Sequence, residues 1–279
     1  IEINFIGLNN TSEKALLKDI PLKVGDDYSD SASNAIIQSL FKTGLFSDIS
    51  VSYNEGTINI SLIENPTIKY FEFTLNSCSG FSNWLKGEKM LMSTELLDEE
   101  LDNNSLSAGN PFTQNKLDDL VSLLKAKYSE SGYYNSVITQ EVSIDAQNRA
   151  GIELTIQQGD RVKIEKFTIT GANKISKDTL LKLFKIGEAD MLLVNYFTNR
   201  DLFTDAEFAQ GIDLMTNAYF DSGYLDFKIL NIDSTLDDKK EKISINIEIS
   251  EGIQYKLGKI SFNEDVNILS DNDLNDVIS

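Results

Sequence analysis

The sequence predicts an α+β protein made of one small unit repeated in tandem, three times in full and with a fourth unit begun at the C-terminal end. Two pairs of segments predict the repeat. Residues 158–169 align with residues 251–262 at an offset of 251 − 158 = 93. Residues 128–134 align with residues 219–225 at an offset of 219 − 128 = 91. Two separate segments that recur at nearly one spacing indicate an internal repeat.

Each unit is expected to open with a short strand followed by a helix. In the first unit Ser12 is placed to cap this helix and Pro21 stops it, because proline lacks the backbone N–H that a helix interior requires. Ser176 is the corresponding N-cap in the third unit. The opening strands are runs in which apolar residues alternate with others. They are Ile3–Gly7, Phe71–Leu75, Phe167–Gly171 and, in the fourth unit, Ile260–Phe262.

A second helix follows, and its apolar residues recur at the three- and four-residue spacings of an amphipathic helix. It ends at Gly44, Gly132 or Gly223. Glycine is favoured there because it readily adopts the left-handed conformation that closes many helices. The apolar positions are Ile36, Ile37, Leu40 and Phe41 in the first unit, Leu117, Leu120, Val121, Leu124 and Tyr128 in the second, and Phe208, Ile212, Met215 and Tyr219 in the third.

Each unit closes with a β-hairpin, predicted from two alternating apolar runs on either side of a polar turn. In the first unit the runs are 49–53 and 58–62. The second hairpin covers 137–156 and the third covers 227–249. The order of elements is therefore β-α-α-β-β. We expect a three-stranded mixed sheet in each unit, with two helices covering one face and water on the other.

Proline or glycine interrupts an apolar run at Asn65-Pro66, Gln158-Gly159 and Glu251-Gly252. Linkers of only a few residues favour a semi-rigid array. The second unit is enlarged by an insertion near residues 76–110. The expected division is 1–66, 67–158 and 159–252 for the three units, and 253–279 for the truncated start of a fourth.

The composition argues against several classes of function. With 44 acidic against 25 basic residues the formal net charge is −19, so no nucleic-acid partner is expected. Histidine is absent, which removes the commonest general base and metal ligand. Cys78 is the single cysteine and has no histidine to activate it. We therefore expect no catalytic residue, no cofactor and no metal site.

Four segments resemble the polypeptide-transport-associated (POTRA) domains of the machinery that assembles bacterial outer-membrane proteins. They are Glu64–Ile68, Phe167–Asn173, Tyr219–Tyr224 and Glu251–Lys256. The resemblance covers the whole chain. It implies a scaffold at the periplasmic face of the outer membrane of a Gram-negative bacterium, touching the membrane only through a C-terminal β-barrel outside this sequence. The partners it implies are unfolded outer-membrane proteins, accessory lipoproteins of the assembly machinery and periplasmic chaperones.

The expected binding mechanism is strand addition. A three-stranded sheet leaves two edges with unpaired backbone N–H and C=O groups, and such an edge accepts an extended peptide. The resemblance implies that the second strand of each unit is the exposed edge, and the third unit is favoured. The residues expected to meet a partner are Asp48, Ile49, Ser50 and Val51 in the first unit, Val137, Ile138 and Thr139 in the second, and Phe227, Lys228, Ile229 and Leu230 in the third.

Other interpretations stay open on sequence alone. Related transporters of the TamA-like or two-partner secretion kinds carry fewer units. A carboxylate-dependent hydrolase would need two acids in one pocket, whereas the acids here are scattered among the repeats. A purely structural spacer is a third alternative, and any single edge can be guarded by its own charges and a neighbouring loop. Trp84 and residues 90–92 are expected to be local core, and the acidic runs 98–100 and 271–273 to be solvated helix faces.

Overall fold

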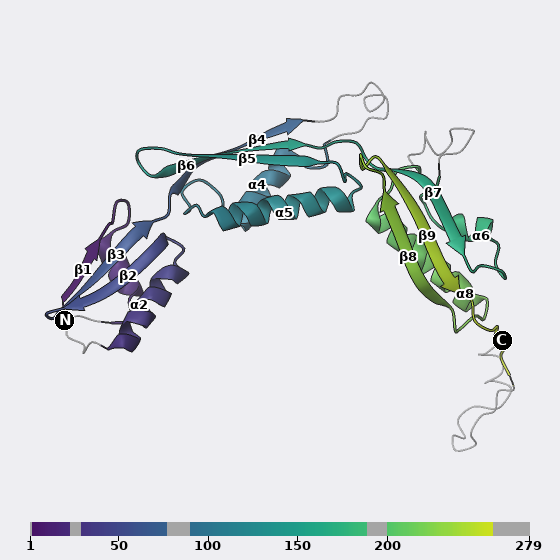
Figure 1. The fold of residues 1–279 in the computed structure, drawn as a ribbon, viewed down its shortest axis with the longest axis horizontal. Helices are drawn as coiled ribbons and strands as arrows, with labels where there is room; N and C mark the ends of the chain where they lie inside the picture. The colour runs from purple at the N-terminus through teal and green to yellow at the C-terminus, as the bar shows by residue number, and fades with distance from the viewer. Residues whose placement is uncertain (1, 23–28, 77–89, 189–199, 259–279) are drawn as a thin grey trace, which may run out of the picture.

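The computed structural model describes residues 2–22, 29–76, 90–188 and 200–258 (Figure 1). The first unit contains β1 (Glu2–Ile6), α1 (Glu13–Asp19), α2 (Asp30–Lys42), β2 (Phe46–Asn54) and β3 (Thr57–Glu64). The second contains β4 (Thr67–Asn76), α4 (Thr94–Asn103), α5 (Gln114–Glu130), β5 (Val137–Ile144) and β6 (Arg149–Gln157). The third contains β7 (Lys163–Thr170), α6 (Lys177–Leu181), α8 (Asp205–Asp221), β8 (Lys228–Leu236) and β9 (Lys242–Ser250).

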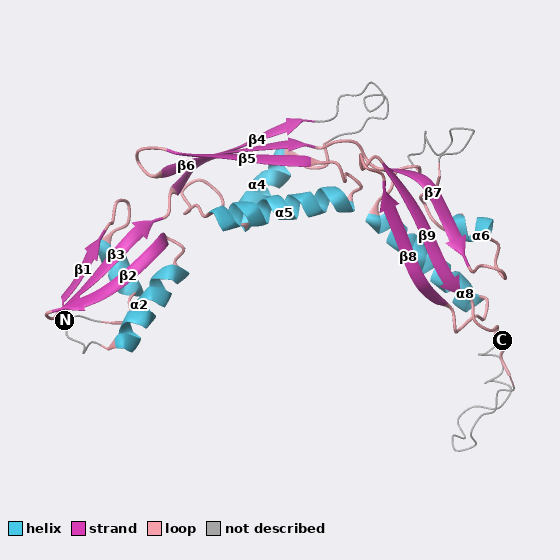
Figure 2. Ribbon diagram, in the orientation of Figure 1, coloured by secondary structure: helices cyan, strands magenta, loops and turns pink. Residues whose placement is uncertain are grey.

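Each unit holds one three-stranded mixed sheet, with strand orders β1-β3-β2, β4-β6-β5 and β7-β9-β8. The last strand of the unit is always central. It pairs in parallel with the opening strand and antiparallel with its hairpin partner. Figure 2 shows the long helix of each unit lying along one face of its sheet. The predicted α+β fold and tandem β-α-α-β-β order are therefore confirmed.

Three separate hydrophobic cores form between the helices and the sheets. In the second unit, Leu124 and Tyr128 of α5 are fully buried in the same core as Ile152 and Leu154 of β6. Both strand residues lie on one face because side chains two positions apart share a face. Met92 is also buried in this core, as expected for residues 90–92. The amphipathic stripes therefore account for the helix-covered face of each sheet.

The helix ends follow the capping chemistry of their sequences. Gly44, Gly132 and Gly223 all have positive φ angles, of 70°, 88° and 83°, as the helix-closing role requires. The hydroxyl of Ser176 accepts a hydrogen bond from the backbone N–H of Thr179 at 3.1 Å, so this predicted N-cap is confirmed. Ser12 occupies the N-cap position of α1 but makes no side-chain capping hydrogen bond.

One contact recurs wherever a unit meets the segment that follows it. The carbonyl oxygen of the helix-closing glycine accepts a hydrogen bond from the next linker. The pairs are Asn65 Nδ2 to Gly44 O at 2.9 Å, Val162 N to Gly132 O at 2.8 Å and Tyr255 N to Gly223 O at 2.7 Å. The end of each second helix is thus tied to the chain beyond its own hairpin.

The second and third units share a further contact through Tyr134. Its ring packs against the third core and lies 6.4 Å from the Phe203 ring, centroid to centroid. Its hydroxyl donates a hydrogen bond to Asp205 at 3.2 Å, and burial with the adjacent carboxylate raises the pKa of Tyr134 to about 12. A residue of the second unit therefore completes the packing of the third. The exact unit limits at 66, 158 and 252 stay predictions.

Several sequence-based expectations lie outside the described residues. They concern Cys78, Trp84, the opening strand Ile260–Phe262 of the fourth unit and the acidic run 271–273. In the part of the chain that is described, no helix is both long and apolar enough to cross a membrane.

Candidate functional site at the sheet edges

Each sheet leaves two edges, one on the opening strand and one on the first hairpin strand. In the second and third units the opening strand is partly covered. Ile68 of β4 exchanges backbone hydrogen bonds with Asn110 and Gly109, each at 2.8 Å. Ile164 of β7 donates its N–H to Asp201 O at 2.8 Å. A neighbouring loop therefore protects the start of each of these strands, one of the usual ways of blocking an edge.

The opposite edges, β5 and β8, are open within the described residues. There, the backbone hydrogen bonds outside the regular ladders and helices do not reach the body of either strand; they close only the adjoining turns. These strands therefore present a row of N–H and C=O groups to solvent. Such a row is a template for an added strand.

In the second unit the predicted residues begin the most regular of the three edges. The β5–β6 register runs without interruption from Val137 to Ile144. Val137 is 48% exposed, whereas Ile138 is buried in the core. Gln140 donates a hydrogen bond from Nε2 to Asp118 of α5 at 3.0 Å, so the strand is held against the helix.

In the third unit the predicted segment is less uniform. Phe227 precedes β8 and is buried, stacked on Tyr219 with ring centroids 4.3 Å apart, so its side chain belongs to the core. Lys228 and Ile229 pair with β9, and the register then shifts before Asn231. The shift leaves Leu230 as a bulge residue, 58% exposed. A bulge interrupts an edge locally, so the regular part of this edge lies beyond residue 230.

In the first unit, Asp48, Ile49, Ser50 and Val51 all lie on β2 and pair with β3. The register shifts between Phe46 and Asp48, so this edge also carries an irregularity near its start. Ile49 is buried, and its N–H donates to the Asp48 carboxylate at 3.0 Å. The three predicted segments therefore lie on equivalent strands, but they differ in how regular an edge they offer.

A polar position that the sequence analysis missed lies at the end of each hairpin. Glu64, Gln158 and Glu251 occupy equivalent places directly after or at the end of the central strand, and all three are buried. Each accepts hydrogen bonds from the backbone of the segment that precedes a helix. The available signal was their recurrence immediately before the predicted boundaries, at Glu64-Asn65, Gln158-Gly159 and Glu251-Gly252.

Glu251 shows the role most fully. Its carboxylate accepts hydrogen bonds from the N–H groups of Lys174 at 2.8 Å and Asn173 at 2.9 Å, and from the Tyr219 hydroxyl at 2.9 Å. Burial alone would raise the pKa of Glu251, but these donors outweigh it and lower the pKa. Burial and the adjacent carboxylate raise the pKa of Tyr219. The Glu64 carboxylate is held in the same way. It accepts a hydrogen bond from the Asn10 N–H at 2.8 Å, and its pKa is also lowered.

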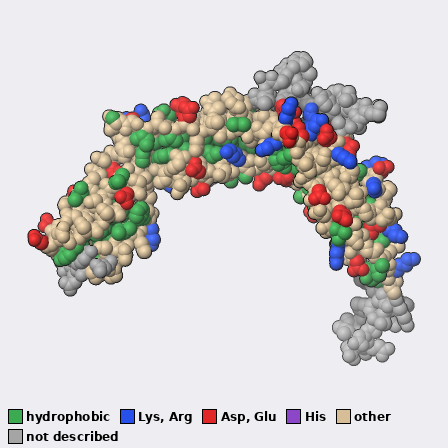
Figure 3. Space-filling model, viewed as in Figure 1, with side chains coloured by type: hydrophobic (Ala, Val, Ile, Leu, Met, Phe, Trp, Pro, Cys, Tyr) green, Lys and Arg blue, Asp and Glu red, His purple; other side chains and the backbone are tan. Residues whose placement is uncertain are grey.

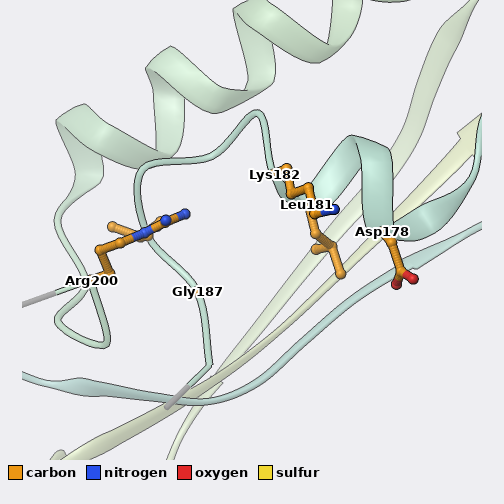
Figure 4. A pocket seen from close by; sticks show the side chains of 6 residues that line it. Asp178, Leu181, Lys182, Gly187 and Arg200 are labelled. Atoms are coloured by element: carbon orange, nitrogen blue, oxygen red, sulfur yellow. The ribbon is translucent and has the colours of Figure 1, made fainter. Parts of the chain in front are cut away.

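The pockets bear on the hydrolase alternative. One, of about 280 Å³, lies beside α6; Figure 4 shows Arg200 on one side of it and Leu181 and Lys182 on the other, and Asp178 is the single acid that lines it. Another, of about 410 Å³, contains Glu130 and Glu207 at the junction of the second and third units. Glu207 is already bonded to the Thr204 hydroxyl at 3.0 Å as part of the α8 cap. The described residues hold no group of three potential metal ligands.

The surface charges are mixed. On the face shown in Figure 3, Lys and Arg side chains are interspersed with Asp and Glu over the third unit. Each of the four ion pairs in the described structure has at least one side chain that is more than one-third exposed, and in Lys242–Glu165, at 2.9 Å, both are. Exposed pairs of this kind contribute at most about 1 kcal/mol each.

Comparison with known proteins defines the class. The family model "POTRA: Surface antigen variable number repeat" matches residues 1–65, 85–159 and 162–252. These matches fall on the three β-α-α-β-β repeats. The chain belongs to the POTRA family.

Particular relatives are outer-membrane assembly factors. The chain is 32% identical over 266 residues to the outer membrane protein assembly factor BamA of Neisseria meningitidis serogroup B, covering 95% of this chain and 32% of that protein. It is 27% identical to BamA of Buchnera aphidicola, covering 94% of this chain and 40% of that protein. The chain thus spans well under half the length of these relatives.

Solved structures with similar repeats include POTRA1-3 of the periplasmic domain of Omp85 from Anabaena. That structure is 11% identical with a TM-score of 0.41, and the match covers 92% of this chain and 95% of the other. POTRA3-5 of BamA from Haemophilus influenzae is 15% identical with a TM-score of 0.38, covering 89% and 94%.

Proposed function

We propose that this chain is part of a scaffold at the periplasmic face of the outer membrane, where it receives unfolded outer-membrane proteins and assists their insertion. Membership of the POTRA family and the similarity to outer membrane protein assembly factors support the process and the location. The observation that carries the binding step is the open edge of β5 and of β8. Bam accessory lipoproteins and periplasmic chaperones are the further partners in this proposal.

The energetics of an open edge suit such a role. Each backbone hydrogen bond in an added strand contributes about 1 kcal/mol net. A segment of four or five residues is therefore held weakly and reversibly. Backbone groups are common to all sequences, so the same edge can receive many different precursors. This part of the mechanism needs no catalytic group, and we propose that the chain acts without catalysis.

A pair of proline substitutions in β8 tests the binding step. Ser234 and Thr235 are adjacent, exposed and beyond the bulge. Because successive N–H groups of a strand point in opposite directions, one of them faces β9 and the other faces solvent. We expect one of Ser234→Pro and Thr235→Pro to keep the stability of the third unit but to abolish peptide binding at β8. The other should lose a ladder hydrogen bond and about 1 kcal/mol or more.

The measurements are thermal unfolding of both variants and NMR titration with a peptide from an outer-membrane protein strand. Wild-type protein should show perturbations along β8, and the stable proline variant should not. If that variant gives the same perturbations as wild type, then β8 does not bind by strand addition. Chain-wide misfolding is excluded by unchanged resonances from the first unit.

A further inference from the structure

Three glutamates form a row across the open face of the second sheet. In the β4–β6 register Glu72 pairs with Glu153, and in the β5–β6 register Glu153 pairs with Glu141. All three side chains are exposed. Residues in one cross-strand row lie on the same face, with neighbouring strands about 4.8 Å apart. The row therefore brings three like charges together, an arrangement that destabilises a sheet.

The equivalent rows of the other two sheets are built differently. In the first sheet the row contains Asn4 and Asn59, joined by a side-chain hydrogen bond of 3.0 Å. In the third sheet it contains Thr168 and Asn246, joined at 2.9 Å, with Asp233 as the single acid. The repeat thus does not require carboxylates at these positions. In the second unit a hydrogen-bonded neutral pair is replaced by repelling charges.

Nothing within the described residues neutralises the glutamate row. The salt bridges there include none of its three members. The cations at the hairpin end are used elsewhere, because Lys69 and Arg149 both pair with Asp145, at 3.8 and 2.8 Å. The row ends at Glu141, on the open edge of β5. An added strand would place its own residue next in the row.

We propose that the β5 edge selects extended segments that carry a lysine or arginine on the open face, opposite Glu141. This inference rests on the proposed function and adds a preference to it. A cation at that place stands about one strand spacing from Glu141 but about three spacings, some 14 Å, from Glu72. At physiological salt the screening length is about 8 Å. Glu141 is therefore the carboxylate that determines the preference.

The other face of β5 defines the rest of the segment. Val142 and Ile144 point to the helix side, in the rows of the buried Ile152 and Ala150, yet they are 36% and 58% exposed. An added strand with apolar residues at alternate positions would cover them. The preferred segment is thus amphipathic, with apolar side chains toward the helices and a basic one toward open solvent.

Three peptides test the charge preference. Each alternates threonine and valine, and its central threonine is replaced by lysine, glutamine or glutamate. They are titrated into the chain at about 0.15 M salt, and β5 resonances are followed by NMR. We expect the lysine peptide to bind about two- to five-fold more tightly than the glutamine peptide, and the glutamate peptide to bind most weakly. If the peptide pairs with β5 two residues out of register, its lysine still lies on the open face of the sheet.

The matched variants are Glu141→Gln and Glu72→Gln, which make the same charge change at opposite edges of one row. The lysine preference should disappear in the first and persist in the second. Equal binding of all three peptides at β5 overturns the charge preference but leaves strand addition intact. A preference lost in Glu72→Gln instead overturns the assignment to β5. Failure of every peptide to perturb β5 overturns strand addition at this edge as well.

Discussion

Replacing Glu251 with leucine is expected to destabilise the third unit by about 3–5 kcal/mol. The carboxylate is the common acceptor for the N–H groups of Asn173 and Lys174 and for the hydroxyl of Tyr219. Leucine has a similar volume but no acceptor, so several donors at a buried site lose their partner together. Chemical denaturation followed through the aromatic signals of the third unit measures the loss. A change below 1 kcal/mol would show that water replaces the carboxylate.

Glu251→Gln is the matched variant, because a glutamine already occupies the equivalent position in the second unit. Gln158 occupies the same place in the second unit, where its Oε1 accepts the N–H of Leu91 at 2.7 Å. A glutamine at 251 keeps one acceptor oxygen, so the expected cost is about 1 kcal/mol. The leucine and glutamine variants therefore separate the loss of all acceptors from the loss of charge.

Acid should act on the same contact. The pKa of Glu251 is lowered in the folded chain from its ordinary value of 4.5. The unfolded chain therefore takes up the proton first as the pH falls. The stability contributed by this group is present above about pH 4.5 and is lost as the pH falls toward the folded pKa. Denaturation between pH 7 and pH 3 should show a smaller acid dependence in Glu251→Gln than in wild type. Equal slopes would contradict the assignment.

Gly132→Ala is expected to cost about 3 kcal/mol or more and to loosen the second unit from the third. Its φ of 88° is unfavourable for any residue with a side chain, at about 1–2 kcal/mol. A Cβ there would also stand 2.1 Å from the backbone oxygen of Phe203. Backbone cannot swing aside as a side-chain tip can. The segment must shift, and the Val162 N–H to Gly132 O hydrogen bond is lost with it.

Gly44→Ala is the control, because Gly44 has a φ of 70° and no atom within 4 Å of a built Cβ. Gly44→Ala should cost only the free energy of holding alanine at a positive φ, about 1–2 kcal/mol. Calorimetry of both variants gives the difference, and amide exchange at Val162 reports the junction directly. If the two alanines cost the same and exchange at Val162 is unchanged, the close approach to Phe203 contributes nothing.

Much of the fold was predictable from local pattern. Alternation of apolar residues identified the hairpins, and helical spacing with a closing glycine identified the long helices, because both signals come from neighbours in the chain. Phe227 was assigned to an edge because it begins the alternating run of the third hairpin, and the resemblance implied that this strand is the edge. Its stacking on Tyr219, however, depends on where α8 ends relative to β8. The bulge at Leu230 has no local signal, since register is set between strands.

The site needed information that the sequence pattern does not contain. Coverage of β4 by residues 109–110 and of β7 by Asp201 comes from loops that are distant along the chain. The glutamate row likewise depends on the register shift between Ile68 and Tyr70, which places Glu72 opposite Glu153. A one-residue error would have moved each side chain to the opposite face. The resemblance predicted which strand of each unit forms the edge. Whether that edge is accessible, and which charges lie in line with it, depends on how the strands pair.

The linker hydrogen bond at each helix-closing glycine has a consequence for biosynthesis. The donor to Gly132 O lies 162 − 132 = 30 residues downstream, and the donor to Gly223 O lies 255 − 223 = 32 downstream. When the chain emerges N-terminus first, each β-α-α-β-β module emerges before the donor that ties its second helix to the next linker. When the next linker emerges, its donor forms the hydrogen bond to the glycine carbonyl oxygen. The units should therefore fold one after another from the N-terminus, and each new linker should stabilise the unit that precedes it.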